Sequence, residues 1–146
     1  MNIVFGIIIG LVILMLLVVA HEFGHFIMAR RNGVRVLEFG IGFAPRAIAW
    51  VKKPVEQKDK DGKPLLDADG KPITKLKWVK IPKKDWSKPQ DSMIFSLNWL
   101  PIGGFCAMDG ESDADRRKGT FGAASFWGKT KILFGGVAMN WLVAFV

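Results

Sequence analysis

Two histidines and a glutamate carry the clearest chemical signal in this sequence. His21, Glu22 and His25 follow the pattern His-Glu-x-x-His, and the chain contains no other histidine. Residues four apart lie on one face of a helix, so the two imidazoles can bind one zinc ion (Zn2+) together. Glu22 beside them can take a proton from a water molecule that zinc activates. The triplet therefore predicts a zinc hydrolase centre with His21 and His25 as metal ligands and Glu22 as general base.

The triplet stands at the end of a long apolar segment. Residues 3–20 carry no charged side chain, which meets the length that a membrane-spanning helix needs. We expect this helix to continue to Arg30 and Arg31 and to stop at Asn32-Gly33. A secretory signal peptide is the competing interpretation, and it is disfavoured because no Lys or Arg precedes the apolar run.

Counting back from the arginines places the triplet below the membrane surface. At about 1.5 Å per helical residue, His25 lies about 7.5 Å and His21 about 13.5 Å from Arg30 along the axis. Both imidazoles would therefore lie inside a hydrocarbon layer about 30 Å thick, where ionisable groups are costly and indicate function. The alternative is a chance motif whose histidines only bond a neighbouring helix, and it leaves a buried Glu22 unexplained.

The charge distribution separates the ends of the chain from its middle. The net charge is +8, and all 21 Lys and Arg residues lie within positions 30–131. Because apolar ends flank this basic stretch, the positive-inside rule explains it better than nucleic-acid binding does. We therefore expect a lipid bilayer and no nucleic acid as partner, with segment 30–131 on the cytoplasmic side. We expect a multi-pass protein, located in the inner (cytoplasmic) membrane of a bacterium. Cys106 is the single cysteine, which excludes an intrachain disulfide.

The remaining residues divide the chain by composition. We predict six segments, which are a first transmembrane helix (1–31), short strands at the membrane face (32–51), a basic polar insertion as a hairpin or loop (52–92), a re-entrant strand segment with Pro-x-Gly-Gly (93–111), a polar loop with an interfacial segment (112–131), and a second transmembrane helix (132–146). The last segment is shorter than the roughly twenty residues needed to cross a bilayer, so we expect a fragment of a longer membrane protein.

Four stretches together resemble the N-terminal part of the site-2 protease family of intramembrane zinc metalloproteases. They are His-Glu-Phe-Gly-His at 21–25, Phe-Gly-Ile-Gly-Phe at 39–43, Leu-Pro-Ile-Gly-Gly-Phe at 100–105, and Gly-Val-Ala-Met-Asn at 136–140. The second and third are similar to the family's membrane-re-entrant β-hairpin, and the fourth to its Gly-x-x-x-Asn helix pattern. His-Glu-x-x-His alone is shared by many metalloproteases, whereas the four stretches in this order are specific.

The resemblance implies a fold, an activity and further site residues. The fold class is a membrane protein of mainly α-helical transmembrane segments, with a re-entrant β-hairpin or small sheet between the first two helices. The activity is zinc-dependent intramembrane endopeptidase cleavage of transmembrane segments in membrane-protein substrates. Three residues are implied in substrate binding, namely Asn140, Gly103 and Gly104. The family's third zinc ligand is an aspartate in a later Asp-Gly motif, expected beyond residue 146. Asp109 is disfavoured for that role, because its segment already matches the re-entrant stretch.

Two other functions stay open at this point. The chain could be a non-enzymatic membrane-embedded binding module, whose histidines only bond neighbouring helices. It could also be a membrane-tethered zinc protease that acts on soluble peptides. Zinc stoichiometry distinguishes the first from an enzyme, and the depth of the triplet in the bilayer distinguishes the second from an intramembrane protease.

Overall fold

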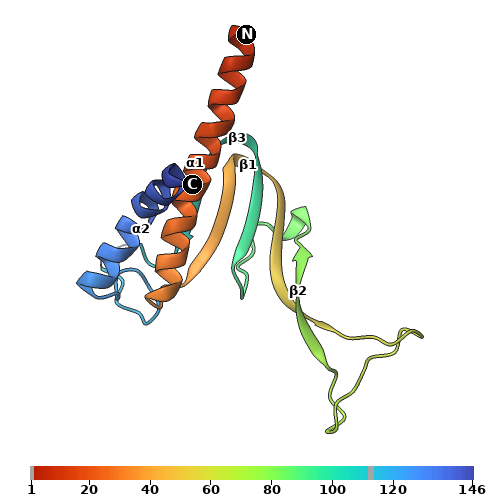
Figure 1. Ribbon diagram of the computed structural model, residues 1–146. Coiled ribbons are helices and arrows are strands. Elements are labelled where there is room, and N and C mark those ends of the chain that lie inside the picture. The colour runs from red at the N-terminus through yellow and green to blue at the C-terminus, as the bar shows by residue number, and fades with distance from the viewer. Residues whose placement is uncertain (1, 112–113) are drawn as a thin grey trace.

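Two helices and a three-stranded antiparallel sheet make up the described part of the chain (Figure 1). The computed structural model describes residues 2–111 and 114–146. The elements in order are α1 (Ile3–Arg31), β1 (Val36–Glu56), β2 (Thr74–Lys80), a 3-10 turn η1 (Lys83–Asp85), β3 (Ile94–Met108) and α2 (Phe126–Phe145). Residue 1 of the predicted first segment and residues 112 and 113 of the predicted polar loop lie outside the described residues.

The predicted fold class, a mainly α-helical protein with several membrane spans, is wrong. The three strands hold 21, 7 and 15 residues, against 29 and 20 in the two helices. Among the described residues, α1 is the one helix that is long and apolar enough to cross a membrane. The prediction failed because it took the strands to be short, whereas β1 and β3 are long and many of their apolar residues pack against α1.

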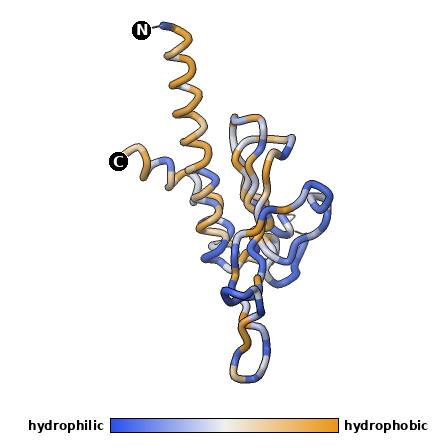
Figure 2. The backbone as a smooth tube through the Cα atoms, turned by 90° about the vertical axis from the view of Figure 1, so that its right-hand side faces the viewer, coloured by the Kyte–Doolittle hydropathy of each residue, from blue (hydrophilic) through white to orange (hydrophobic). Residues whose placement is uncertain are grey.

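Helix α1 has two halves with different surroundings. Its first half projects from the rest of the chain and is apolar and exposed, as Figure 2 shows for the N-terminal end. Its second half packs against α2 and β3. Arg30 and Arg31 form the last turn, where cations favour the negative end of the helix. Asn32 ends the helix, and its Nδ2 donates to the carbonyl of Met28 at 2.8 Å.

Strand β1 lies at the centre of the sheet, between β2 and β3. Its residues 38–41 pair with β3 on both sides, with 94–97 on one side and with 104–107 on the other. Both strands must therefore bend. Gly42 and Gly103 lie at these bends with φ values of 77° and 87°, which only glycine adopts without strain. A side chain at Gly42 would also collide with the carbonyl of a neighbouring strand residue.

The bends of β1 and β3 form an apolar sheet tip. Its large side chains are 40–73% exposed and belong to Phe43, Leu97, Trp99, Leu100 and Ile102. Figure 1 draws these bends beside the middle of α1. The sheet tip and the apolar half of α1 therefore expose hydrocarbon surface on the same part of the molecule.

The main hydrophobic core lies where α1, α2 and the sheet meet. Its buried members are Ala29, Val34, Val36, Phe39, Cys106 and Ile132. Phe39 stacks on Phe95 with centroids 6.0 Å apart and meets the rings of Phe23 and Phe26 edge-on. A smaller cluster of Ala49, Val51 and Ile81 packs under Trp86 on another part of the sheet. The core fixes the sheet against the half of α1 that carries the histidines.

The basic insertion forms a hairpin that extends away from both helices (Figure 1). Strand β2 is exposed along its whole length. Two turns of the same kind close the hairpin: Asp59 Oδ1 accepts from the backbone of Asp61 and Lys63, and Asp67 Oδ1 accepts likewise in the second copy. The repeated Asp-Gly-Lys-Pro sequence thus marks turns of one type.

Candidate metal centre

Helix α1 places the two histidine rings side by side. The centroids of His21 and His25 are 4.7 Å apart, and the rings meet edge to face. This arrangement follows directly from their spacing, because residues four apart stand one above the other on a helix. Both side chains lie on the half of α1 that faces α2 and β3.

Each imidazole is bound through its Nδ1 atom by helix α2. His25 Nδ1 lies 2.8 Å from the carbonyl oxygen of Ile132, so it donates its proton there. His21 Nδ1 lies 3.3 Å from the side-chain amide of Asn140. A ligating histidine usually holds its second ring nitrogen in this way, which fixes the ring for metal binding through the first.

The two Nε2 atoms converge on Gly136 of α2. A Cβ atom built on Gly136 would lie 2.6 Å from His21 Nε2 and 2.6 Å from His25 Nε2. A side chain there would fill the space between the two nitrogens, so glycine leaves a cradle between them. Two nitrogens that face one space while both Nδ1 atoms are engaged suit zinc, which binds imidazole at about 2.0–2.1 Å. This donor arrangement fits the metal.

Glycines on both helices allow α2 to come this close. A Cβ on Gly24 would collide with the backbone of Gly135 and lie 2.9 Å from Cα of Gly136. A Cβ on Gly135 would lie 2.7 Å from the carbonyl oxygen of Gly24. Small residues of this kind permit helices to pack backbone to backbone in apolar surroundings. The close packing is what brings the α2 backbone to the imidazoles.

Strand β3 supplies the other wall beside Glu22. A Cβ on Gly104 would lie 3.7 Å from Glu22 Cγ and 3.9 Å from Val19. Gly103 faces elsewhere, since a Cβ on it would meet the ring of Phe43. The structure thus brings Gly104 to the triplet, as it brings Asn140, whereas Gly103 serves the bend of the sheet. The predicted catalytic, metal-binding and substrate-binding roles remain predictions.

The described residues contain no group of three or more His, Cys, Asp or Glu side chains that could hold a metal ion. A hydrolytic zinc site uses three protein ligands and a water, so the cradle supplies two of the three. Asp109 is held elsewhere, in ion pairs at 2.5 Å with Arg35 and at 3.5 Å with Arg117. These pairs tie the start of β1 and the segment after β3 together.

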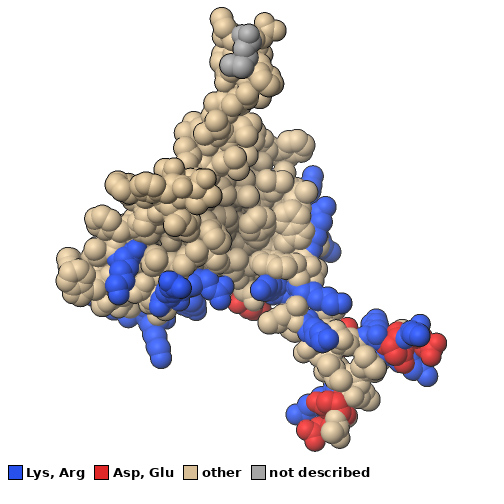
Figure 3. All heavy atoms as spheres, viewed as in Figure 1, with Lys and Arg blue, Asp and Glu red and all other residues tan. Residues whose placement is uncertain are grey.

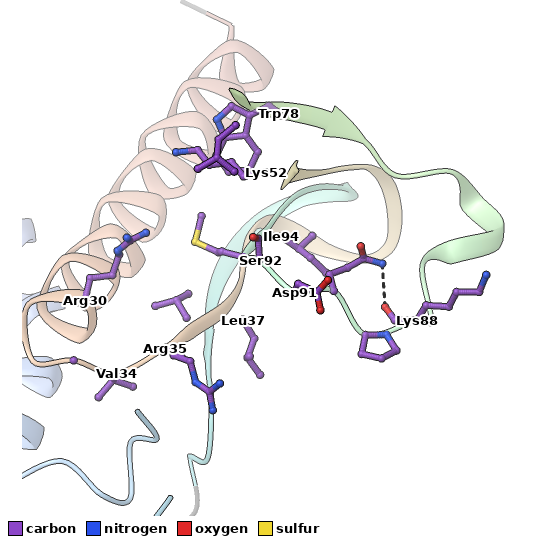
Figure 4. A pocket seen from close by; sticks show the side chains of 16 residues that line it. Arg30, Val34, Arg35, Leu37, Lys52, Trp78, Lys88, Asp91, Ser92 and Ile94 are labelled. Atoms are coloured by element: carbon purple, nitrogen blue, oxygen red, sulfur yellow. Dashed lines mark hydrogen bonds between the residues drawn. The ribbon is translucent and has the colours of Figure 1, made fainter. Parts of the chain in front are cut away.

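A separate groove of about 800 Å³ opens beside the last turn of α1 (Figure 4). Arg30, Lys52, Trp78 and Asp91 are among its lining residues, and the histidines, Glu22, Asn140 and both implied glycines are not. The Lys52 ammonium lies over the ring of Trp78, 5.2 Å from its centroid. The groove is therefore distinct from the candidate metal centre.

Part of the chain is similar to a known protein family. The family model for Peptidase family M50 matches residues 9–58, which include the His-Glu-x-x-His triplet. The resemblance to site-2 proteases is confirmed. Over these residues the chain is similar to zinc metalloproteases of Peptidase family M50.

Three relatives illustrate the similarity. A protein of Streptococcus pyogenes that is named as a zinc metalloprotease is 28% identical over 108 residues, covering 74% of this chain and 17% of its own length. Zinc metalloprotease Rip1 of Mycobacterium tuberculosis is 24% identical over 151 residues, covering the whole chain and 28% of its own length. A zinc metalloprotease by name from Rhizobium meliloti is 42% identical over 43 residues, covering 30% of this chain and 12% of its own length. The chain thus spans roughly a sixth of the curated Streptococcus relative.

Sequence reasoning missed the backbone contributions to the site. Gly136 was noted as part of a helix pattern, but its place between the imidazoles was not predicted, nor was the role of the Ile132 carbonyl. Gly24, Gly135 and Gly136 inside apolar helices are a signal of close helix packing that could have pointed to it.

Proposed function

We propose that this protein is a zinc-dependent endopeptidase that cuts transmembrane segments of membrane-protein substrates within the bilayer. The observation that carries the proposal is the convergence of His21 Nε2 and His25 Nε2 on the Gly136 cradle. Glu22 stands beside them and next to strand β3. We place the centre within the apolar layer, because α1 is apolar up to the arginines of its last turn.

The residues divide the chemistry among themselves. His21 and His25 would hold zinc through Nε2, and the resemblance implies an aspartate as third ligand. Bound zinc supplies a Lewis acid that makes water easier to deprotonate and polarises a peptide carbonyl. Glu22 accepts the proton of the attacking water and passes it to the amide nitrogen that leaves.

Strand β3 offers a means of holding the substrate. Among the described residues its segment 104–107 pairs with β1 on one side only, and Gly104 puts its backbone beside Glu22. A transmembrane helix hides its peptide bonds in internal hydrogen bonds, so a cleavable segment must be extended. A strand edge can take such a segment by β-addition, which would deliver its carbonyl next to the general base.

Replacing Glu22 by Gln tests the proposal. The amide keeps the size of the side chain but cannot accept the water proton, so cleavage of a membrane-anchored substrate should fall at least 100-fold, on the scale of general-base catalysis. Zinc content of the full-length protein should stay unchanged. Glu111→Gln, in the segment after β3, is the matched control and should leave cleavage unaffected. Cleavage by Glu22→Gln at the normal rate would refute the mechanism.

A further inference from the structure

The side chain of Asn140 has one of its two polar atoms unsatisfied. Its Nδ2 lies 3.3 Å from His21 Nδ1, while its Oδ1 is buried with no hydrogen-bond partner among the described residues. Burying a carbonyl oxygen without a hydrogen-bond donor is energetically unfavourable. The amide oxygen and nitrogen are nearly the same size, so turning the group by 180° keeps its packing and exchanges the two atoms.

The two orientations of the amide demand different tautomers of His21. When Nδ2 faces the ring, Nδ1 must be the acceptor and the ring proton sits on Nε2, which then has no lone pair for a metal. When Oδ1 faces the ring, Nδ1 carries the proton and donates it to Asn140. The lone pair of His21 Nε2 is then free, and the buried Oδ1 of Asn140 accepts a hydrogen bond from Nδ1.

The hydrogen bond of His25 identifies the tautomer that suits metal binding at this site. Its Nδ1 faces the carbonyl oxygen of Ile132, an atom that can only accept, so the proton is on Nδ1 and Nε2 is free. His21 Nε2 faces the same cradle at Gly136 as His25 Nε2 does. A proton on either of these two Nε2 atoms would prevent the rings from binding one metal ion together. Shared metal binding therefore requires the Nδ1–H tautomer in both rings.

We propose that Asn140 is a positioning residue that accepts the Nδ1 proton of His21 through Oδ1. It thereby holds the ring in the tautomer that presents Nε2 to the metal. The inference rests on the zinc centre of the proposed function, and it adds to the substrate-binding role that the resemblance implies for Asn140. Helix α2 then controls both imidazoles, one through a side chain and the other through the Ile132 backbone.

The tautomer of His21 is measurable without any metal. In metal-free, full-length protein, ¹⁵N NMR of the histidines above their titration range should show Nδ1–H in both rings of the wild type. Asn140→Asp keeps the acceptor at the same size and should preserve this state. Asn140→Leu removes the acceptor at similar volume, and His21 should then populate the Nε2–H form while His25 does not. An unchanged His21 tautomer in Asn140→Leu would overturn the inference.

Zinc affinity gives the second readout. Chelator competition should show affinity reduced about 10–100-fold in Asn140→Leu, as for other partners of ligating histidines, and close to wild type in Asn140→Asp. Leu142→Ala, on the exposed side of α2, is the matched control. If Asn140→Leu binds zinc normally and only KM rises, Asn140 serves substrate alone and the inference fails. If the wild type holds the tautomer but binds no zinc, the proposed function fails and the role of Asn140 in fixing the ring stands.

Discussion

At the scale of single residues, the candidate metal centre depends on a glycine, which has no side chain. Gly136 leaves open the space that both Nε2 atoms face, and a methyl group there would stand 2.6 Å from each of them. Gly136→Ala should therefore lower zinc affinity at least tenfold, measured by chelator competition on the full-length protein. Gly10→Ala is the control, because a Cβ at Gly10 meets nothing within 4 Å. Unchanged zinc affinity in Gly136→Ala would mean that the cradle is not the metal site.

The sequence reveals the part of this site that lies within one helix, and it does not reveal the contacts between the two helices. The spacing of His21, Glu22 and His25 fixes their arrangement within a single helix, so the triplet could be recognised from the sequence alone. Asn140 came only through resemblance, because nothing in its own neighbourhood says which residue of α1 it meets. The Ile132 carbonyl was beyond prediction, since a backbone atom becomes part of a site only through the way two helices pack.

At the scale of elements, the approach of α1 to α2 rests on glycine contacts. Gly24→Ala would force a methyl group against the backbone of Gly135 and Gly136, which cannot move aside without separating the helices. We expect a loss of about 1–3 kcal/mol in the free energy of unfolding, the usual cost of overpacking. Reversible unfolding in detergent measures it. Gly6→Ala is the matched control in open surroundings, and it should leave stability nearly unchanged.

The reactivity of the Cys106 thiol can report on the packing of β3 against the helices. Cys106 is 8% exposed in the main core, and burial, followed by the negative charges of Glu22 and Glu111, raises the pKa of its thiol to about 12. Iodoacetamide at pH 8 should therefore leave Cys106 unmodified in the folded protein and alkylate it in denaturant, as mass spectrometry would show.

The same pKa shift has a consequence for stability. A raised thiol pKa means that ionisation favours the unfolded state, so this contribution is complete below pH 9 and is lost as the pH rises towards 12. In the alkylation experiment, rapid modification of Cys106 in the folded protein at pH 8 would show that β3 does not bury this thiol against the helices.

The sheet shows the limit of reading strands from sequence. The composition indicated short strands in 32–51 and a polar insertion in 52–92, whereas β1 runs from Val36 to Glu56 and β2 from Thr74 to Lys80. The double pairing of residues 38–41 could not be predicted, since it joins segments more than fifty positions apart. Helix α2 begins at Phe126, earlier than its apolar run, because Ser125 caps it by accepting from the backbone of Gly128 at 3.1 Å.

At the scale of the whole molecule, charge and hydrocarbon surface occupy opposite ends. Figure 3 shows Lys and Arg around the end of α1, on the hairpin and along one side of the body, while the projecting half of α1 carries none. We propose that the apolar end lies in the bilayer, with the basic end and the hairpin in the cytoplasm.

Cysteine labelling tests this placement. In a Cys106→Ala background, Phe23→Cys should resist a membrane-impermeant maleimide even though the Phe23 side chain is 45% exposed. Lys71→Cys on the hairpin should react from the cytoplasmic side of inverted vesicles and not from the outside of intact cells. Fast labelling at position 23 would instead favour a membrane-tethered protease that acts on soluble peptides.

The projecting hairpin and the contact between the two helices differ in how much sequence change they tolerate. Its two Asp-Gly-Lys-Pro turns are closed by their own aspartates, and β2 leaves no side chain in the core. Extra residues between these turns should lower the stability of the fold only slightly, because the entropic cost of closing a surface loop grows slowly with its length. The hairpin can therefore gain or lose whole turns across descendants of this chain, while any side chain at Gly24, Gly135 or Gly136 would press against the facing helix.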